Sequence, residues 1–147
     1  MPRLETFRRE RERLNARVLE RATLETRRFF SLDGQCYRDG ALPARTKELL
    51  GLVASLVLRC DDCVAYHLIR CAEEGVGDEE MMEALNVGLV VGGSIVIPHL
   101  RRAVDFLDEI RAEQAAGGAK PRSSEPRPGA PRPAKRRRAP SPHPRLG

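Results

Sequence analysis

Two cysteines separated by two residues are the part of this sequence best suited to carry chemistry. Cys60 and Cys63 lie in the segment Arg59-Cys60-Asp61-Asp62-Cys63, which opens a predicted helix. Residues three apart meet on adjacent helical turns, so small movements bring the two sulfur atoms to disulfide distance. A helix N-terminus and a neighbouring cation lower the pKa of a thiol, whereas the carboxylates of Asp61 and Asp62 act in the opposite direction. The spacing predicts a redox-active dithiol.

Proton-transfer groups lie at helical spacing beside these thiols. His67 follows Cys63 by four residues, so its imidazole lies over the next turn, within reach of that sulfur. Glu48 precedes the apolar run that leads to Cys60, and a carboxylate on a buried helix can orient an imidazole and hold a proton. Taken alone, a glutamate in a first turn more often serves the helix dipole. Reversible two-electron thiol exchange needs a thiol pair with such a group.

A metal site is the main alternative for the same residues. Cys60, Cys63, His67 and Cys71 form one helical stripe. However, the first and last of them are roughly 16 Å apart along the helix, too far for one tetrahedral ion. The sequence contains no second CxxC or HxxxH pair that would supply further ligands. We therefore favour redox chemistry over zinc binding.

The remaining candidates fit packing better than chemistry. Cys71 fits a core position, because a buried free cysteine behaves as a small hydrophobe. Cys36, in the second predicted helix, and Tyr66, beside His67, are also interpreted as packing residues. His99 falls in the first turn of the last predicted helix, where a solvated or locally bonded side chain is expected unless an assembled pocket recruits it.

Helices must position the cluster, because apolar residues recur at helical spacing throughout the first 116 residues. A charged amphipathic first helix is predicted from the spacing of Phe7, Leu14, Val18 and Leu19. Further helices are predicted from a cap at Thr23 towards the Asp39-Gly40 turn, over 44–58, from Asp61 or Asp62 to Gly75, from a cap at Asp78 to Gly92-Gly93, and from Pro98 onwards. The β-branched runs at 90–91 and 95–97 have no alternating partner segment, so helix is favoured there. The expected fold is all-α, with about six helices.

The same pattern predicts which faces are buried. The run Leu49–Leu58 is apolar on every side, as expected of a central helix that is buried all round. Leu100, Val104, Leu107 and Ile110 form the expected inner stripe of the last helix. Because only 4% of the residues are aromatic, the core must be mainly aliphatic. A body this short can need subunit contacts to complete such a core.

Charge divides the chain into two parts. Nine of the 26 basic residues and one of the 21 acidic residues fall in residues 117–147, so this segment carries +8 and the rest −3. The segment also holds eight of the 11 prolines, a composition that predicts disorder. Its Lys135–Arg138 cluster could bind phosphate backbones, but a solvated tail with incidental anion affinity is favoured. The domain itself does not have the charge of a nucleic-acid-binding fold.

Targeting segments are not expected. Residues 1–22 are rich in Arg and Glu and have no apolar core of a secretory signal. The longest apolar stretches, Leu49–Leu58 and Val87–Ile97, fall short of the ~20 residues that a membrane span needs. We therefore expect a soluble cytoplasmic protein, in which a close cysteine pair is more often catalytic or metal-binding than structural.

Glu48, eleven residues, Cys60, two residues, Cys63, three residues and His67 together form a specific constellation. It resembles the signature of the alkylhydroperoxidase D-like proteins of the carboxymuconolactone decarboxylase family. The flanking sequence is also similar to that of the family. It has Leu42-Pro43 and Thr46-Lys47-Glu48-Leu49 before the cysteines, and Ala72-Glu73-Glu74-Gly75, Asp78-Glu79-Glu80 and Gly92-Gly93 after them. The resemblance covers residues 40–112, and residues 1–39 resemble the N-terminal helical extension of small stand-alone members. Residues 1–116 would then be one domain, followed by the tail at 117–147.

This resemblance implies an all-helical domain that forms a trimer or hexamer and has thiol-dependent peroxidase activity. Cys63 would be the peroxidatic thiol, Cys60 the resolving thiol, and Glu48 and His67 the proton relay. The implied partners are a hydroperoxide substrate and a dithiol reductant, either a thioredoxin-like protein or a lipoyl group, and no metal or bound organic cofactor is implied. Well-characterised peroxidase members place a second histidine directly before the second cysteine, where this chain has Asp62.

Two other functions are compatible with the sequence. The CxxC pair could serve redox sensing or disulfide exchange without peroxide turnover, an alternative that Asp62 motivates. Glu48 and His67 could also act as acid and base in a small-lactone decarboxylase or isomerase. The decarboxylases of the family lack the cysteine pair, so its presence here favours the thiol activity.

Overall fold

Six α-helices and one short 3₁₀ helix make up most of residues 3–117, the part of the chain that the computed structural model describes. In chain order they are α1 (Arg3–Glu20), α2 (Leu24–Cys36), α3 (Ala44–Val57), α4 (Asp61–Glu73), α5 (Asp78–Gly92), η1 (Ser94–Val96) and α6 (Ile97–Ala116). These residues contain no strand, so the predicted all-α fold is confirmed. None of the described helices is both long and apolar enough to cross a bilayer. Residues 118–147, with the predicted basic tail, lie outside the described part.

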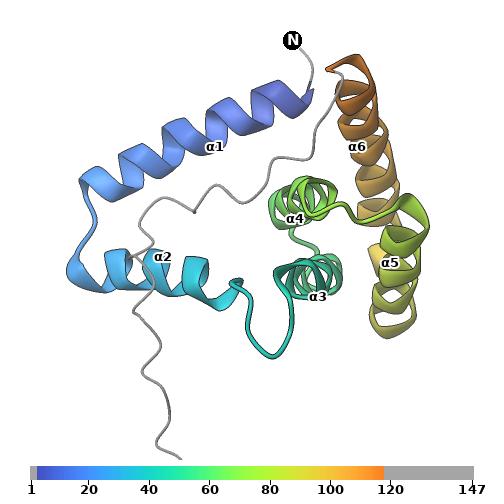
Figure 1. Cartoon of the computed structure of the whole chain (residues 1–147), viewed down its shortest axis with the longest axis horizontal. Helices are drawn as coiled ribbons and strands as arrows, with labels where there is room; N and C mark the ends of the chain where they lie inside the picture. The colour runs from blue at the N-terminus through green and yellow to red at the C-terminus, as the bar shows by residue number, and fades with distance from the viewer. Residues whose placement is uncertain (1–2, 118–147) are drawn as a thin grey trace, which may run out of the picture.

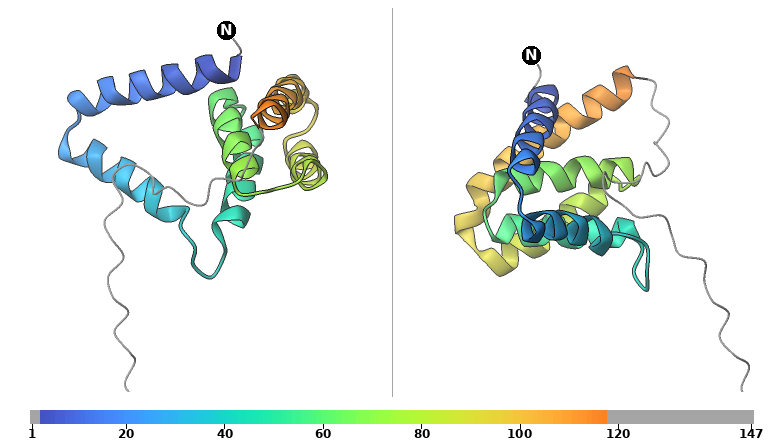
Figure 2. Two further views of the ribbon diagram at one scale, coloured as in Figure 1. Left: turned by 45° about the horizontal axis from the view of Figure 1, so that its top comes forward. Right: turned by 90° about the vertical axis from the view of Figure 1, so that its left-hand side faces the viewer.

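The helices form a core and an arm. Figures 1 and 2 show α3 and α4 side by side, with α5 and α6 next to them, and α1 and α2 together on the other side. α3 packs against both α4 and α5, and α4 also packs against α6. The buried core residues come almost entirely from these four helices. We call α3–α6 the core and α1–α2 the arm.

The arm meets the core chiefly through the first turns of α1. Leu4 is buried, and the Phe7 ring contacts the Phe106 ring of α6 edge-on at 5.8 Å between centroids. Arg3 forms ion pairs with Asp105 and Glu109 of α6. Further contacts are few: the Arg11 guanidinium lies 4.0 Å from the Tyr66 ring centre, and Lys47 Nζ donates to the Cys36 carbonyl at 3.0 Å. No residue of α2 is buried.

The junction between α3 and α4 delivers the cysteine pair. Arg59 has a left-handed backbone (φ 58°), and its N–H donates to the Leu56 carbonyl at 3.0 Å. The Cys60 N–H donates to the Ser55 carbonyl, also at 3.0 Å. This turn terminates α3 and starts α4 within three residues. Such a position favours glycine, and a left-handed non-glycine residue costs about 1–2 kcal/mol.

The ends of α4 and α5 follow local chemistry. Gly75, with φ +74°, terminates α4 as predicted. The predicted cap of α5 at Asp78 is wrong by one residue, because Gly77 is the N-cap. Glu80 causes this difference, since its carboxylate accepts the Gly77 N–H at 2.9 Å and so fixes the start of the helix there.

Two burial predictions are also wrong. α3 is not buried all round, because α4 and α5 cover only part of it and leave Leu50 and Leu58 exposed by 55% and 76%. On α6, Val104 faces outward, while Ala103 and Phe106 are buried with the predicted Leu107 and Ile110. The buried face of α6 includes Phe106 because α1 packs against α6 at that residue.

Candidate functional site

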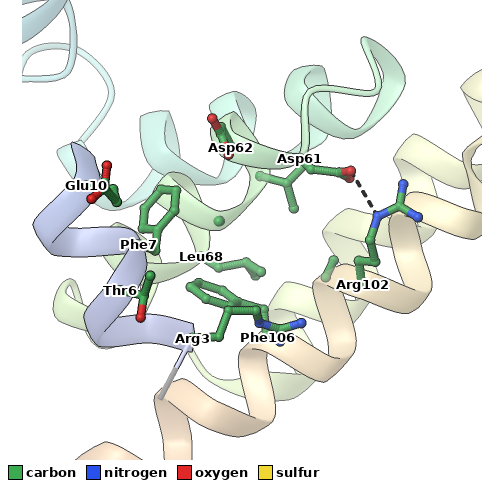
Figure 3. A pocket seen from close by; sticks show the side chains of 12 residues that line it. Arg3, Thr6, Phe7, Glu10, Asp61, Asp62, Leu68, Arg102 and Phe106 are labelled. Atoms are coloured by element: carbon green, nitrogen blue, oxygen red, sulfur yellow. Dashed lines mark hydrogen bonds and ion pairs between the residues drawn. The ribbon is translucent and has the colours of Figure 1, made fainter. Parts of the chain in front are cut away.

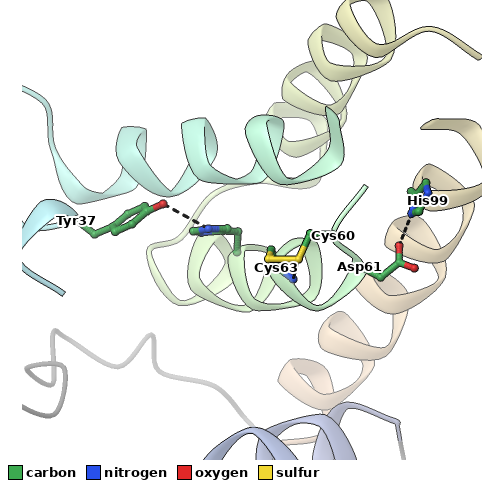
Figure 4. Close-up of a disulfide and its surroundings, with 6 residues drawn as sticks. Tyr37, Cys60, Asp61, Cys63 and His99 are labelled. Carbon is green, nitrogen blue, oxygen red and sulfur yellow. Dashed lines mark hydrogen bonds and ion pairs between the residues drawn. A yellow bond between two sulfur atoms is a disulfide. The ribbon is translucent and has the colours of Figure 1, made fainter. Parts of the chain in front are cut away.

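Cys60 and Cys63 form a disulfide at the start of α4 (Figure 4), with their Cα atoms 5.2 Å apart. Cys60 is the N-cap residue of the helix, and its sulfur accepts the Cys63 N–H at 3.3 Å. Cys63 is exposed, whereas Cys60 is half-buried. The pair expected from the spacing is therefore assembled where the helix N-terminus presents its unpaired N–H groups.

His67 and Glu48 meet beneath this pair in the interface of α3 and α4. The His67 Nδ1 lies 2.8 Å from Glu48 Oε2, and both side chains are buried. Because a carboxylate only accepts hydrogen bonds, Nδ1 carries the proton of this bond and Nε2 is left to exchange protons. The sequence predicted this pairing, and the structure brings the two residues together.

Arg70, whose side chain is half-buried, is a third member of this group that the sequence analysis missed. Its Nε lies 3.6 Å from Glu48 Oε1, and its other nitrogens pair with Glu73 and Glu74. Burial acts to lower the pKa of Arg70, but the carboxylates of Glu73 and Glu48 outweigh it and hold this pKa above its usual value. A permanent cation therefore lies beside Glu48. The available signal was the spacing, because Arg70 follows His67 by three residues on the same helical face.

The second nitrogen of His67 faces two residues that the sequence analysis also missed. The Tyr37 hydroxyl, just beyond α2, lies 3.5 Å from Nε2, an interaction drawn as a dashed line in Figure 4. Gly51 leaves room for both groups, because a Cβ there would lie 2.7 Å from Nε2 and 2.8 Å from the Tyr37 oxygen. A glycine inside an apolar helical run was the visible signal. Tyr66 packs edge-on against the same imidazole, as expected for a packing residue.

Asp61, inside the CxxC segment, is held by α6. His99 Nδ1 lies 2.7 Å from Asp61 Oδ1, and Arg102 Nε lies 2.9 Å from Asp61 Oδ2. Burial acts to raise the pKa of Asp61, but the hydrogen bonds from His99 and Arg102 outweigh it and bring that pKa below its usual range. His99 has the expected local contact, with Arg102 three residues along the chain, and it also has a partner 38 residues away that the sequence did not indicate.

The other cysteines do not join the site. Cys71 is fully buried in the core, as predicted, and burial raises the pKa of its thiol to about 12. The packing role predicted for Cys36 is wrong, because α2 buries no residue and Cys36 is exposed. Among residues 3–117, no group of three or more His, Cys, Asp or Glu side chains is arranged to hold a metal ion.

A cavity of about 290 Å³ lies between α1, α4 and α6 (Figure 3). Asp61, Ala65 and Leu68 contribute to its lining from one face of α4. Cys63 and His67 are offset from that face by two residues, which is about 200° around the helix. The cavity therefore lies on the side of α4 away from the thiol and the imidazole.

Chemically, the arrangement provides a dithiol that can open and close and an imidazole anchored one turn away. The disulfide is at the surface, where a peroxide or a second dithiol can reach Cys63. The imidazole is fixed from both sides by the Glu48 carboxylate and the Tyr37 hydroxyl.

Comparisons with known proteins give consistent matches. The model of the carboxymuconolactone decarboxylase family matches residues 25–106. An uncharacterised protein in the cox locus of Paracoccus denitrificans is 33% identical over 82 residues, which is 56% of this chain and 74% of the relative. An uncharacterised protein of Cupriavidus necator is 29% identical over 75 residues, covering 51% of this chain and 66% of the relative.

Two crystal structures of a protein from Thermotoga maritima are similar to the structure of this chain. One has a TM-score of 0.76 and 61% sequence identity, and the match covers 77% of this chain and 99% of the crystallised chain. The other has a TM-score of 0.74 and 60% sequence identity, and the match covers 78% of this chain and 97% of the crystallised chain. The latter is described as a carboxymuconolactone decarboxylase family protein with a suggested role in an antioxidative response.

Proposed function

The chain belongs to the carboxymuconolactone decarboxylase family, and we propose that it is a thiol-dependent peroxidase of the alkylhydroperoxidase D-like type. The observation that carries this proposal is the Cys60–Cys63 pair at the start of α4, one turn before the buried His67–Glu48 pair. The antioxidative role suggested for the Thermotoga relative supports it.

In the first step, the Cys63 thiolate attacks the terminal oxygen of a hydroperoxide. The O–O bond breaks, the sulfur is oxidised to a sulfenic acid, and the alkoxide leaves as the alcohol after taking one proton. The exposure of Cys63 supports its role as the attacking thiol. His67, four residues along α4, is the donor and acceptor for the protons of this step, and Glu48 holds the imidazole in place.

In the second step, the Cys60 thiolate attacks the sulfenic sulfur of Cys63. An S–S bond forms, the S–O bond breaks, and hydroxide leaves as water after taking a proton. The Cα distance of 5.2 Å supports this closure. A dithiol reductant, either a thioredoxin-like protein or a lipoyl group, then reduces the disulfide by two exchanges and is itself oxidised. A cytoplasmic location is part of the proposal, because thiols are kept reduced there.

Homo-oligomer formation, as a trimer or hexamer, is part of the proposal. A hollow of about 570 Å³ on α3 and α5 is lined almost entirely by apolar side chains. Leu50, Leu58, Val87 and Val91 are among the exposed residues on this surface. Apolar surface of this kind is typical of an interface, and a second copy of the chain would bury it.

A lactone decarboxylase or isomerase mechanism has less support. Glu48 and His67 are 1% and 7% exposed and are bonded to each other. Neither residue lines the cavity beside α1 or the hollow on α3 and α5. An acid and a base for a lactone would need access to such a space.

The test is hydroperoxide consumption by the purified protein with excess dihydrolipoamide or thioredoxin, each tested separately. We expect sustained turnover that is lost in both Cys63→Ser and Cys60→Ser, and retained in Cys36→Ser as the matched control. Disulfide formation without turnover would contradict the peroxidase and indicate a sensor or exchange protein. Lactone conversion that survives removal of both thiols would indicate the acid–base alternative.

A further inference from the structure

The two carboxylates between the cysteines are adjacent in sequence but have different environments. Asp61 has both oxygens bonded to α6. Asp62 is exposed, and no hydrogen bond or ion pair to its carboxylate occurs within the described part of the chain. An anion beside a thiol opposes formation of the thiolate. The two residues are therefore expected to affect the cysteine pair differently.

His99 and Arg102 form one clasp on the first turns of α6. They are three residues apart and so face the same way, and each takes one oxygen of Asp61. Arg102 Nη2 also lies 3.0 Å from His99 Nδ1, because both groups converge on the same carboxylate. Since Asp61 is the first residue of α4, the clasp fixes the segment between Cys60 and Cys63 to a helix about forty residues away in sequence.

We propose that His99 and Arg102 are positioning residues for the cysteine pair, which neutralise Asp61 from α6 and leave Asp62 as the carboxylate that opposes thiolate formation. The inference deepens the proposed function and rests on it, because the thiolate is the reactive form of the peroxidatic cysteine. In the proposed role both residues act through Asp61 and not through contact with a sulfur atom.

Other charged groups surround the segment but are not part of the clasp. Arg59 precedes Cys60, while the Glu48–His67–Arg70 group lies between α3 and α4. On the α1 side, Arg3 and Glu10 line the cavity that Asp61 and Asp62 also line (Figure 3). These groups form a constant background against which single substitutions in the clasp can be compared.

The magnitude expected from an uncompensated charge is measurable. A unit charge within roughly 6–8 Å of a thiolate near the surface changes the thiol pKa by about one pH unit. When Arg102 is lost, the Asp61 carboxylate is no longer balanced and the thiol pKa rises. When Asp61 is replaced by a neutral residue, no carboxylate holds the Arg102 side chain in place. The guanidinium then extends into solvent, where it has little effect on the thiol pKa.

The test measures alkylation of the reduced protein by iodoacetamide as a function of pH, in a Cys36→Ser background, with mass spectrometry to locate the product on Cys60 or Cys63. We expect Arg102→Gln to raise the apparent thiol pKa by about one pH unit and to slow alkylation several-fold at neutral pH. Arg102→Lys keeps the charge and is expected to retain the original profile. Asp62→Asn is expected to lower the apparent pKa by about the same amount.

Coupling between Asp61 and Arg102 separates an electrostatic role from a structural one. In an Asp61→Asn background, Arg102→Gln should change the profile by less than a third of its effect in the original background. An equal effect in both backgrounds would overturn the proposal. So would an Arg102→Gln protein with an unchanged profile, whether or not its Tm falls, because the clasp would then only fasten α4 to α6.

The alkylation assay contains no peroxide, so its outcome is independent of turnover. If the profile moves as expected but the protein consumes no hydroperoxide, the clasp stands and the proposed peroxidase fails. If turnover is found but the profile does not move, the peroxidase stands and the clasp fails.

Discussion

The core and the arm contain similar helical patterns but differ in what covers their apolar side chains. In the core, Leu52, Leu56 and Leu68 are fully buried. In the arm, Leu24 and Leu32 are 56% and 62% exposed. Periodicity therefore predicts a helix in both regions, but it does not predict that a partner helix is present.

The two regions are also held by different forces. Burial of apolar area stabilises the core, at roughly 25 cal/mol per Å². The arm has only a small apolar contact with the core, made by Leu4 and Phe7. It is otherwise fastened to α6 by exposed ion pairs such as Arg3–Asp105 and Arg8–Glu113, and pairs of this kind are usually worth less than about 1 kcal/mol. The chemistry follows the same division, since the disulfide and the His67–Glu48 pair lie in the core.

The largest predicted effect compares one leucine from each region. Leu56→Ala should lower the free energy of unfolding by about 3 kcal/mol, because it opens a cavity in the packed core. Leu32→Ala should change it by less than about 0.5 kcal/mol in the dissociated chain, because that side chain is already exposed. Urea unfolding at low protein concentration measures both. Equal losses would show that the arm is packed as tightly as the core.

The second prediction compares the two free cysteines. Because the pKa of Cys71 is raised to about 12 in the folded protein and an unfolded thiol ionises near 9.0, its contribution to stability is complete below pH 9 and is lost as the pH rises towards 12. The free energy of unfolding should fall there by up to about 1.4 kcal/mol per pH unit from this group. Cys71→Ala should remove this part of the slope, and Cys36→Ala should leave it. An unchanged slope in Cys71→Ala would show that ionisation of the Cys71 thiol does not cause the loss of stability.

The smallest predicted effect concerns the junction that joins α3 to α4. Arg59→Gly relieves the left-handed backbone and should raise the free energy of unfolding, by no more than about 1 kcal/mol, because glycine also loosens the unfolded chain. Alkylation of the cysteine pair should slow, because a cation beside Cys60 is removed. Arg59→Lys is the control that keeps the charge. A loss of stability in Arg59→Gly would mean that the arginine side chain makes stabilising contacts at this turn.

The sequence was sufficient to predict the helices and the cysteine pair, because helical spacing and the distance between Cys60, Cys63 and His67 are local properties. It also predicted that Glu48 belongs with His67, through the resemblance to a family. The Asp61–His99 and Asp61–Arg102 bonds could not be predicted, because they join α4 to α6 and depend on how the two helices pack. The exposed face of α3 was missed for the same reason.

Gly51 and Tyr37 show a different limit. A glycine in an apolar helix is visible in the sequence, but the two groups that it accommodates, the His67 imidazole and the Tyr37 hydroxyl, come from α4 and from the residue that follows α2. Only the packed structure shows that Tyr37 reaches the site.

The central claim is that Cys63 is the thiol that reacts with peroxide, and trapping its sulfenic acid tests this most directly. The reduced Cys60→Ser protein is treated with one equivalent of cumene hydroperoxide in the presence of dimedone, and the product is located by mass spectrometry. We expect one equivalent of cumyl alcohol and a dimedone adduct on Cys63. An adduct on Cys60 in the Cys63→Ser protein, with none on Cys63 in Cys60→Ser, would contradict it.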